Sequence, residues 1–286
     1  MSVRLVITDA MWDRIEPLMP ADPVRGRRWA DHRRTLEAIA WKYRTCSPWR
    51  DLPDELGSFQ TAHKRLVRWA VDGTWERILA APLEVADAGD DIGWTVSVDS
   101  TVCRAHQHAA GAGKKGFPDR AEPDDHALGC SRGGLSTKVH LVSDSHARPL
   151  VLHVTAGQAG DAPAFEAVMA GIRVPRSGPG RPKTRPDAVL ADRAYSSRAI
   201  RSHLRRRGIR AVIPQPSDQV GHRLRRGSAG GRPPAFDAET YKQRNAVERC
   251  INRFKQWRGL AMRTDKLAIA YQAAFHLAAI LIWARR

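Results

Sequence analysis

The sequence predicts an α/β protein in which a helical N-terminal unit precedes a mixed five-stranded sheet. Helical periodicity dominates the first part of the chain, whereas short runs of β-branched residues alternate with amphipathic segments from Trp94 onward. A chain of 286 residues can bury a full core and hold one large and one small unit. We therefore expect a helical domain over residues 1–90 and an α/β domain over residues 91–286.

The helical unit is predicted from its capping residues and its apolar faces. Thr8 and Asp31 can each cap a helix. Pro48 and Pro53 then interrupt the chain before a third helix over residues 58–72. The basic side chains expected to point out of this third helix are His63, Lys64, Arg65 and Arg68. The arrangement is typical of a helix-turn-helix with the third helix as the recognition helix, and the alternative is a plain helical subdomain with a solvated basic face.

Five later runs, rich in β-branched and apolar residues, are predicted strands. These runs cover residues 95–99, 137–143, 149–155, 187–192 and 209–214. The first three follow one another directly, which indicates an antiparallel meander. Helices are expected near 162–172 and 197–207, so the order of elements predicts a mixed sheet. Two Gly- and Pro-rich segments with basic residues, near 105–134 and 216–234, are expected to be irregular insertions.

The charge of the chain predicts a polyanionic partner. Its 47 Lys and Arg residues exceed its 30 Asp and Glu residues by 17, and the excess is clustered. Five arginines stand between Arg25 and Arg34, and nine stand against one Asp between Arg201 and Arg232. The planar guanidinium group suits phosphate oxygens. We therefore expect the protein to bind nucleic acid.

Other classes of protein are disfavoured. The four cysteines lie far apart, which argues against a disulfide framework or a zinc ribbon and predicts a reducing, cytoplasmic setting. The apolar run over 267–284 is interrupted by Gln272 and His276, so a buried helix is expected rather than a membrane span. The Gly111–Lys115 tract lacks the spacing of a phosphate-binding loop, so no nucleotide cofactor is expected. A zinc site remains an alternative, with ligands among Cys103, His106, His108, His126 and Cys130.

A segment near the C-terminus carries an unusual set of polar residues at helical spacing. Tyr241, Arg244, Glu248 and Lys255 follow at steps of three, four and seven, which places them within one sector of a single helix. A separate apolar face is formed by Val247, Cys250, Ile251, Phe254 and Trp257. A simpler interpretation is that Glu248 only pairs with Arg244 four residues away.

Three acids from three elements can converge near this segment. Asp99 and Asp192 are each expected at the end of a strand, and Glu248 is expected on the helix beside the sheet. Three carboxylates could hold two hard divalent cations, and oxygen ligands favour Mg²⁺ or Mn²⁺. Such a pair promotes in-line displacement at phosphorus. The sequence therefore predicts a metal-dependent phosphodiester chemistry at Asp99, Asp192 and Glu248.

On these residues the chain resembles the DDE transposases of bacterial insertion sequences, in the broad group of families four and five and most closely family five. The family signature of Tyr, two residues, Arg, three residues, Glu, six residues and Lys matches Tyr241 to Lys255. The acids lie in the family contexts Val96-Ser-Val-Asp99-Ser-Thr101 and Leu190-Ala-Asp192-Arg-Ala-Tyr195, and the segments Pro48–Pro53 and Asp265–Leu267 also match. Cys46 departs from the pattern, because the family usually has Gly there.

The resemblance implies a fold, an activity and roles for residues. The fold would be RNase H-like, and Asp99, Asp192 and Glu248 would be both catalytic residues and ligands of two Mg²⁺ or Mn²⁺ ions. Arg244 and Lys255 would contact DNA phosphates, while Tyr241 would stack on a base, orient a phosphate or serve in packing. Contacts from the recognition helix would come from Lys64, Arg65 and Arg68.

The implied partners are double-stranded terminal inverted repeats and target DNA, bound by a homo-oligomer in the bacterial cytoplasm or on the nucleoid. Water and then the released 3′-hydroxyl would be the nucleophiles. Three alternatives remain: a recombinase that links Tyr or Ser to DNA, a DNA-binding regulator derived from a transposase, and an RNase H-like host nuclease.

Overall fold

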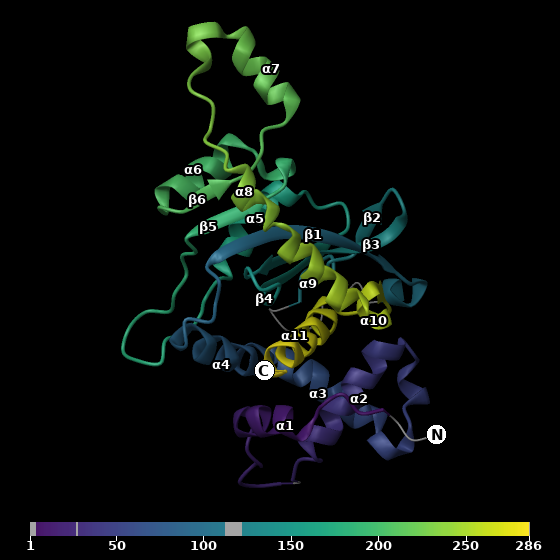
Figure 1. The fold of residues 1–286 in the computed structure, drawn as a ribbon. Helices are drawn as coiled ribbons and strands as arrows, with labels where there is room; N and C mark the ends of the chain where they lie inside the picture. The colour runs from purple at the N-terminus through teal and green to yellow at the C-terminus, as the bar shows by residue number, and fades with distance from the viewer. Residues whose placement is uncertain (1–3, 27, 112–121, 286) are drawn as a thin grey trace.

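The computed structural model describes residues 4–26, 28–111 and 122–285, and one mixed sheet lies at its centre (Figure 1). The strands are β1 (Thr95–Ala105), β2 (Gly129–Ser131), β3 (Gly134–Ser143), β4 (Pro149–Ala156), β5 (Ala188–Ala191), β6 (Arg210–Val212) and β7 (Met262–Arg263). The five predicted strands correspond to β1, β3, β4, β5 and β6. The short β2 continues the edge of β3 that β4 occupies, and β7 continues the edge of β1 that β5 occupies.

The sheet has the order β4-β3-β1-β5-β6. Strands β1, β3 and β4 pair antiparallel as the predicted meander, whereas β5 is parallel to β1 and β6 is parallel to β5. The fold is therefore α/β and RNase H-like, as predicted. The three strands of the meander are long, and β5 and β6 are short, so the parallel half of the sheet ends early beside β1.

Helices surround this sheet on both faces. They are α1 (Asp9–Ile15), α2 (His32–Thr45), α3 (Phe59–Val71), α4 (Thr74–Ala88), α5 (Asp161–Ala170), α6 (Arg198–Arg206), α7 (Ser217–Arg225), α8 (Ala238–Lys242), α9 (Asn245–Lys255), α10 (Arg258–Ala261) and α11 (Ala268–Ala284). Short 3₁₀ turns are η1 (Glu16–Leu18), η2 (Trp49–Asp51), η3 (Asp54–Leu56), η4 (Gln107–Gly111), η5 (Arg193–Tyr195) and η6 (Gly227–Gly230).

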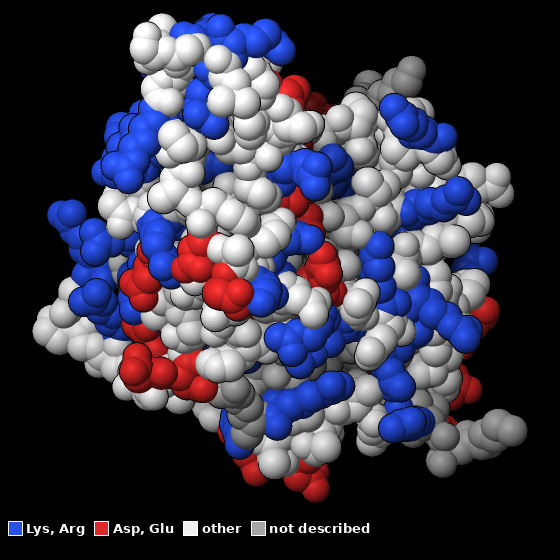
Figure 2. All heavy atoms as spheres, turned by 45° about the horizontal axis from the view of Figure 1, so that its top comes forward, with Lys and Arg blue, Asp and Glu red and all other residues white. Residues whose placement is uncertain are grey.

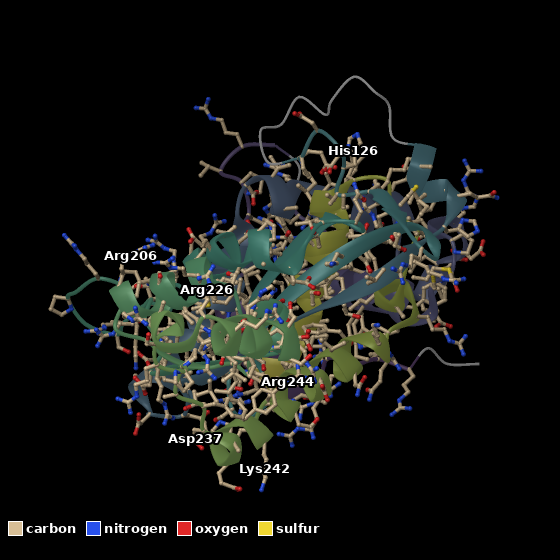
Figure 3. All side chains as sticks on the ribbon, turned by 90° about the horizontal axis from the view of Figure 1, so that it is seen from above. His126, Arg206, Arg226, Asp237, Lys242 and Arg244 are labelled. Carbon is tan, nitrogen blue, oxygen red and sulfur yellow. The ribbon has the colours of Figure 1, made fainter. Side chains whose placement is uncertain are left out.

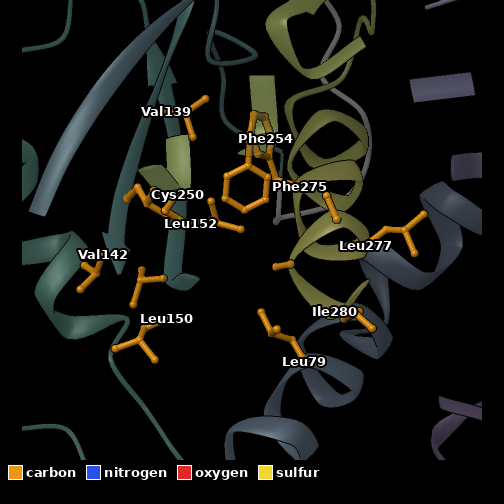
Figure 4. Close-up of a cluster of buried hydrophobic side chains, with 14 of the residues drawn as sticks. Leu79, Val139, Val142, Leu150, Leu152, Cys250, Phe254, Phe275, Leu277 and Ile280 are labelled. Carbon is orange, nitrogen blue, oxygen red and sulfur yellow. The ribbon is translucent and has the colours of Figure 1, made fainter. Parts of the chain in front are cut away.

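Helices α9 and α11 pack together through Phe254 and Phe275, whose rings lie 5.2 Å apart, and both contact the sheet. Figure 4 shows the apolar side chains between β3, β4, α9, α11 and Leu79 of α4. Helix α5 also packs against β3 and β4, through Phe165, Val168 and Met169. The helices thus bury the sheet, and successive residues of each strand point alternately to its two faces.

The N-terminal helices begin where their capping residues predict. The Thr8 hydroxyl accepts from the Met11 amide at 3.3 Å, and Asp31 accepts from the Arg34 amide at 2.5 Å. Helices α1 to α4 pack against α11, and Tyr43 of α2 donates to Asp265 at 2.8 Å just before α11 begins. The helical unit and the sheet therefore share one continuous hydrophobic core.

Helix α11 is buried along almost its whole length, which confirms the prediction of a buried C-terminal helix. Apolar residues lie on all sides of α11, as expected for a helix that other elements enclose. Within residues 4–26, 28–111 and 122–285 no helix is long and apolar enough to cross a membrane.

Three predictions of local structure were wrong. Strand β1 continues six residues beyond Asp99, because Ser100 to Arg104 stay paired with β3. The segment 216–234 holds helix α7 instead of only irregular chain. The helix predicted over 241–255 is two helices, because α8 ends at Lys242 and α9 begins at Asn245.

The junction between α8 and α9 is a tight turn. Its amides bond three residues back, with Arg244 to the Tyr241 carbonyl at 2.9 Å and Val247 to the Arg244 carbonyl at 3.1 Å. The two helices pack on different strands, α8 through Tyr241 on β5 and β6 and α9 on β1 and β3. Most of the Gly111–Lys115 tract, including Lys114 and Lys115, lies outside the described residues.

Candidate active site

Asp99 and Asp192 lie at corresponding positions of neighbouring parallel strands. The pairing of β1 with β5 ends at Val98 and Ala191, so Asp99 and Asp192 are the next residue on each chain. Residues in register on parallel strands point to the same face, and neighbouring strands lie about 4.8 Å apart. The two carboxylates therefore share one face where the parallel pairing stops. The premature end of β5 leaves Asp192 beside a β1 strand that continues.

Each of these two acids is oriented by a backbone amide. The Ser100 amide donates to Asp99 at 2.8 Å, and the Ala194 amide donates to Asp192 at 2.9 Å at the start of η5. Burial raises the pKa of Asp99, and the nearby charge of Asp192 raises it further, against the lowering effect of the Ser100 amide and Arg244. A cation near Asp99 would therefore stabilise its charged form.

Glu248 reaches the same site through Arg244. The Arg244 guanidinium donates from Nη1 to Asp99 Oδ2 at 2.9 Å and from Nη2 to Glu248 Oε1. Burial alone would lower the pKa of Arg244, but the hydrogen bond and charge of Asp99 raise it overall. Arg244 thus joins the first acid, in β1, to the third acid, in α9. The simpler interpretation, in which Glu248 only pairs with Arg244 four residues away, does not account for the bond to Asp99.

The three predicted ligands are all carboxylates, and carboxylate oxygens suit hard divalent cations. In the described residues, however, no three His, Cys, Asp or Glu side chains lie close enough together to hold one ion. Glu248 is joined to Asp99 by Arg244 rather than placed against it. The three acids thus come from adjoining elements, and the Arg244 side chain lies between Asp99 and Glu248.

The alternative zinc site is not assembled. Cys103, His106, His108, His126 and Cys130 all lie in the described residues, yet they form no group that could hold a metal ion. Burial raises the pKa of the Cys103 thiol, which disfavours the thiolate that zinc requires. His126 is paired with Glu122 at 2.6 Å.

The two remaining residues of the signature lie on either side of Arg244 and Glu248. Tyr241 packs against Ala188, Leu190 and Val212 of the sheet, and its ring lies 5.3 Å from that of Phe236. Lys255 is exposed at the end of α9, close to Thr101 and Cys103 of β1. Tyr241 therefore packs on the sheet in this structure, and its contact with DNA stays a prediction.

Sequence reasoning missed a polar network on the opposite face of β1. Ser100 points away from Asp99 and donates to Asp161 at 2.6 Å, and Lys138 donates to the same carboxylate at 3.1 Å. Tyr195 is buried on this face, and burial raises the pKa of its phenol, as do the charges of Asp161, Asp99 and Asp192. Asp161 follows Gly160 at the start of a helix, so its sequence context resembled an ordinary helix start.

The prediction that Arg65 points out of the third helix towards DNA is contradicted by its burial. Arg65 is only 5% exposed, with its guanidinium 3.7 Å from the centre of the Trp29 ring and bonded to His32 at 3.2 Å. Its charged end folds back over Trp29 and Trp69, because cation–π contacts favour a buried guanidinium between aromatic rings. Lys64 and Arg68 are exposed on α3, as predicted.

Two family models match the chain. The model described as "Transposase DDE domain" matches residues 92–283, and the model described as "Putative transposase of IS4/5 family" matches residues 7–79. The first match spans the whole sheet, all three acids and the helices α5 to α10, together with nearly all of α11.

Several proteins are similar over part of the chain. A putative transposase for insertion sequence element IS6501 of Brucella ovis is 29% identical over 53% of this chain and 100% of its own length. A putative transposase for insertion sequence element IS402 of Burkholderia cepacia is 31% identical over 53% of this chain and 64% of its own length. Uncharacterized protein y4sN of Sinorhizobium fredii is 37% identical over 37% of this chain and 82% of its own length.

Among solved structures, the Mos1 transposase paired-end complex with left transposon end shares 13% identity and covers 84% of this chain and 82% of that chain, with a TM-score of 0.25. The fold assignment rests on the strand order and the family models, because the superposition is poor.

Proposed function

The chain belongs to the DDE transposase family, and on that premise we propose that Asp99, Asp192 and Glu248 are its catalytic acids. The observation that carries the proposal is the register between β1 and β5, which puts Asp99 and Asp192 side by side on the face covered by α9. Arg244 ties Glu248 to the same face. No other set of acids in the described residues combines this geometry with the signature spacing.

DDE transposases act with divalent metal ions. We propose that the three acids hold two Mg²⁺ or Mn²⁺ ions, which would activate the attacking oxygen and stabilise the leaving oxygen at phosphorus. The raised pKa of Asp99 supports this assignment, because its buried charge calls for a compensating cation.

Arg244 is proposed to exchange partners when DNA binds. In the DNA-free protein its guanidinium is held by Asp99 and Glu248. A DNA phosphate offers the same paired oxygens to the guanidinium fork. Release of Arg244 to the phosphate would free both carboxylates for the metal ions and hold the scissile strand in line. Lys255, exposed farther along α9, would contact a phosphate beside it.

The substrate is proposed to be the terminal inverted repeats of an insertion sequence, with target DNA as the acceptor. Water would release a 3′-hydroxyl at the element's end, and that hydroxyl would attack the target phosphodiester. The helical unit over residues 1–90 is proposed to recognise the repeats with Lys64 and Arg68 of α3, which are exposed. Because two ends must be joined, we expect a homo-oligomer.

The proposal is tested by strand cleavage on a duplex that carries the ends of the element. Wild-type protein is expected to nick it only with Mg²⁺ or Mn²⁺, and Glu248→Gln is expected to bind it equally well without nicking. Glu239→Gln is the matched control, because Glu239 is an exposed acid of neighbouring α8 that pairs with Lys242 at 2.8 Å.

The remaining alternatives give different results in the same assay. A regulator derived from a transposase would bind the ends without nicking under any metal. A host nuclease would cut duplexes that lack the terminal repeats, and a recombinase would leave Tyr or Ser covalently attached to the DNA after denaturation.

A further inference from the structure

A cleft lined by arginines includes Ser196, four residues after Asp192 in the chain. It lies between α6 and α7, has a volume of about 730 Å³, and no Asp or Glu lines it. The arginines that line it are Arg198, Arg201, Arg205, Arg223, Arg226 and Arg232. Figure 2 shows Lys and Arg side chains spread over the face that includes this end of the molecule, and Figure 3 labels Arg226, which lines the cleft.

Three of the lining arginines lie along one side of α6. Arg198, Arg201 and Arg205 are spaced by three and four residues and so form one stripe, while Ile200 and Leu204 are buried on the other side. The stripe therefore faces the cleft as a consequence of how α6 packs against β6.

Within the described residues these six arginines form no ion pair with a carboxylate. By contrast, Arg210 forms an ion pair with Asp237, and Arg244 forms ion pairs with both Asp99 and Glu248. The Nε atoms of Arg201 and Arg223 are buried without a hydrogen-bond partner. Buried donors of this kind are normally satisfied, so the cleft presents unused donors for an anion.

The second wall of the cleft is held by few contacts. Helix α7 buries no residue of its own, and Figure 1 shows it projecting away from the sheet. A nine-residue helix without packing is marginal in water. A polyanion between α6 and α7 would add contacts to both walls and stabilise this arm.

The residue of the cleft nearest in sequence to the candidate active site is Ser196. Buried Ser196 follows Asp192 by four residues and bonds Gln219 of α7 at 3.1 Å and Arg201 of α6 at 2.9 Å. A DNA strand whose scissile phosphate lies at Asp192 would leave the site along this edge, directly into the cleft.

We propose that the cleft between α6 and α7 binds consecutive backbone phosphates of the DNA strand on one side of the scissile bond. The inference rests on the proposed function, because it takes the scissile phosphate to lie at Asp192. The ligand is the phosphodiester backbone and not the bases, since arginine donors dominate the lining.

The test compares two double variants of the full chain with equal charge. Arg205→Gln with Arg226→Gln removes two exposed arginines of the cleft, one from each wall. Arg206→Gln with Arg225→Gln removes exposed neighbours on the same two helices that do not line it. The cleft variant should bind an end duplex about tenfold more weakly, with a salt dependence shallower by roughly two phosphate contacts. The control should stay near wild type.

Neutral methylphosphonate linkages locate the contact. When these linkages lie on the side of the scissile bond that enters the cleft, they should weaken DNA binding by wild-type protein and by the control variant but not by the cleft variant. When they lie on the other side, they should weaken DNA binding by all three proteins alike. Equal behaviour of the two double variants would overturn the inference. Failure of the proposed function is distinguishable, because wild-type protein would then not nick any end duplex in Mg²⁺.

Discussion

The Arg244 guanidinium lies 2.9 Å from the Asp99 carboxylate, with Nη1 donating to Oδ2, although 145 residues separate them in sequence. The same guanidinium donates to Glu248 from its other terminal nitrogen. One cation therefore joins the first and third of the three proposed catalytic acids. A divalent ion that used both acids would compete with Arg244, so under the proposed function Arg244 would link metal binding to DNA binding.

Replacing Arg244 by Gln should strengthen metal binding to the DNA-free protein. The change removes the competing cation and leaves Asp99 and Glu248 with unbalanced charge, so Mn²⁺ affinity should rise roughly tenfold, as expected for loss of about one charge-assisted hydrogen bond. Titration followed by electron paramagnetic resonance of free Mn²⁺ measures it. Arg249→Gln, an exposed neighbour on α9, controls for net charge. Unchanged or weaker affinity in Arg244→Gln would remove Arg244 from this role.

The linkage has a second consequence for the wild-type protein. Because coupling between two ligands is reciprocal, adding an end duplex should raise Mn²⁺ affinity, and Mn²⁺ should raise DNA affinity by the same factor. Much of this coupling should be lost in Arg244→Gln. In both proteins, the Mn²⁺ bound by the DNA itself is subtracted from the total bound Mn²⁺ before the affinities are compared.

Arg65 should behave as a structural residue, unlike its two neighbours on α3. Arg65→Ala removes a buried guanidinium packed on Trp29 and Trp69, so the free energy of unfolding should fall by about 1–3 kcal/mol. Lys64→Ala and Arg68→Ala should lower DNA affinity with much smaller effects on stability. Chemical denaturation and binding measured in parallel separate the two classes. Full stability of Arg65→Ala would show that its burial contributes nothing.

Cys46 has a backbone conformation that favours glycine, the residue that the family resemblance leads us to expect at this position. It caps the C-terminus of α2 with φ at 62°, in the left-handed region that favours glycine. Cys46→Gly should raise the free energy of unfolding by up to about 1 kcal/mol, because relief of strain outweighs the entropy of the unfolded glycine. Cys46→Ala keeps the same φ and should give no such gain. A destabilised Cys46→Gly protein would contradict the account.

Buried His276 should make the protein less stable in mild acid. Burial lowers its pKa to about 4, against about 6.5 in an unfolded chain. Between these values the unfolded chain binds a proton that the folded protein does not, so stability falls as the pH drops from about 6.5 towards 4. His276→Leu should remove about 2 kcal/mol of the loss between pH 7 and pH 5. Urea unfolding at both pH values measures this, and an unchanged loss would refute it.

The sequence predicted the five main strands and their antiparallel meander, and it singled out three acids that stay a prediction, because each depends on local patterns. Alternation marks the strands, and the signature spacing marks Glu248 whatever surrounds it. The break between α8 and α9 could not be predicted, because it arises from tertiary packing: Tyr241 packs on β5 and β6, while α9 packs on β1 and β3. The burial of Arg65 depends likewise on Trp29, which approaches α3 from 36 residues away.

The bridge formed by Arg244 lay beyond sequence reasoning for the same reason. Its spacing to Glu248 is visible in the chain, whereas its bond to Asp99 depends on α9 packing across β1. The arginine cleft could not be predicted for a different reason, because its wall α7 lies in a Gly-rich stretch whose sequence pattern only weakly indicates a helix. Nine-residue helices without a buried face leave little pattern to detect.

If Asp99, Asp192 and Glu248 hold the catalytic metal directly, replacing one of them by a softer ligand should change which metal supports nicking. In Asp192→Cys the ligand becomes a soft thiolate, which binds Mn²⁺ better than Mg²⁺. This variant should not nick an end duplex in Mg²⁺ and should regain nicking in Mn²⁺, while Asp192→Ala should be inactive in both. Equal loss of nicking by Asp192→Cys in both metals, with DNA binding intact, would contradict direct ligation by Asp192.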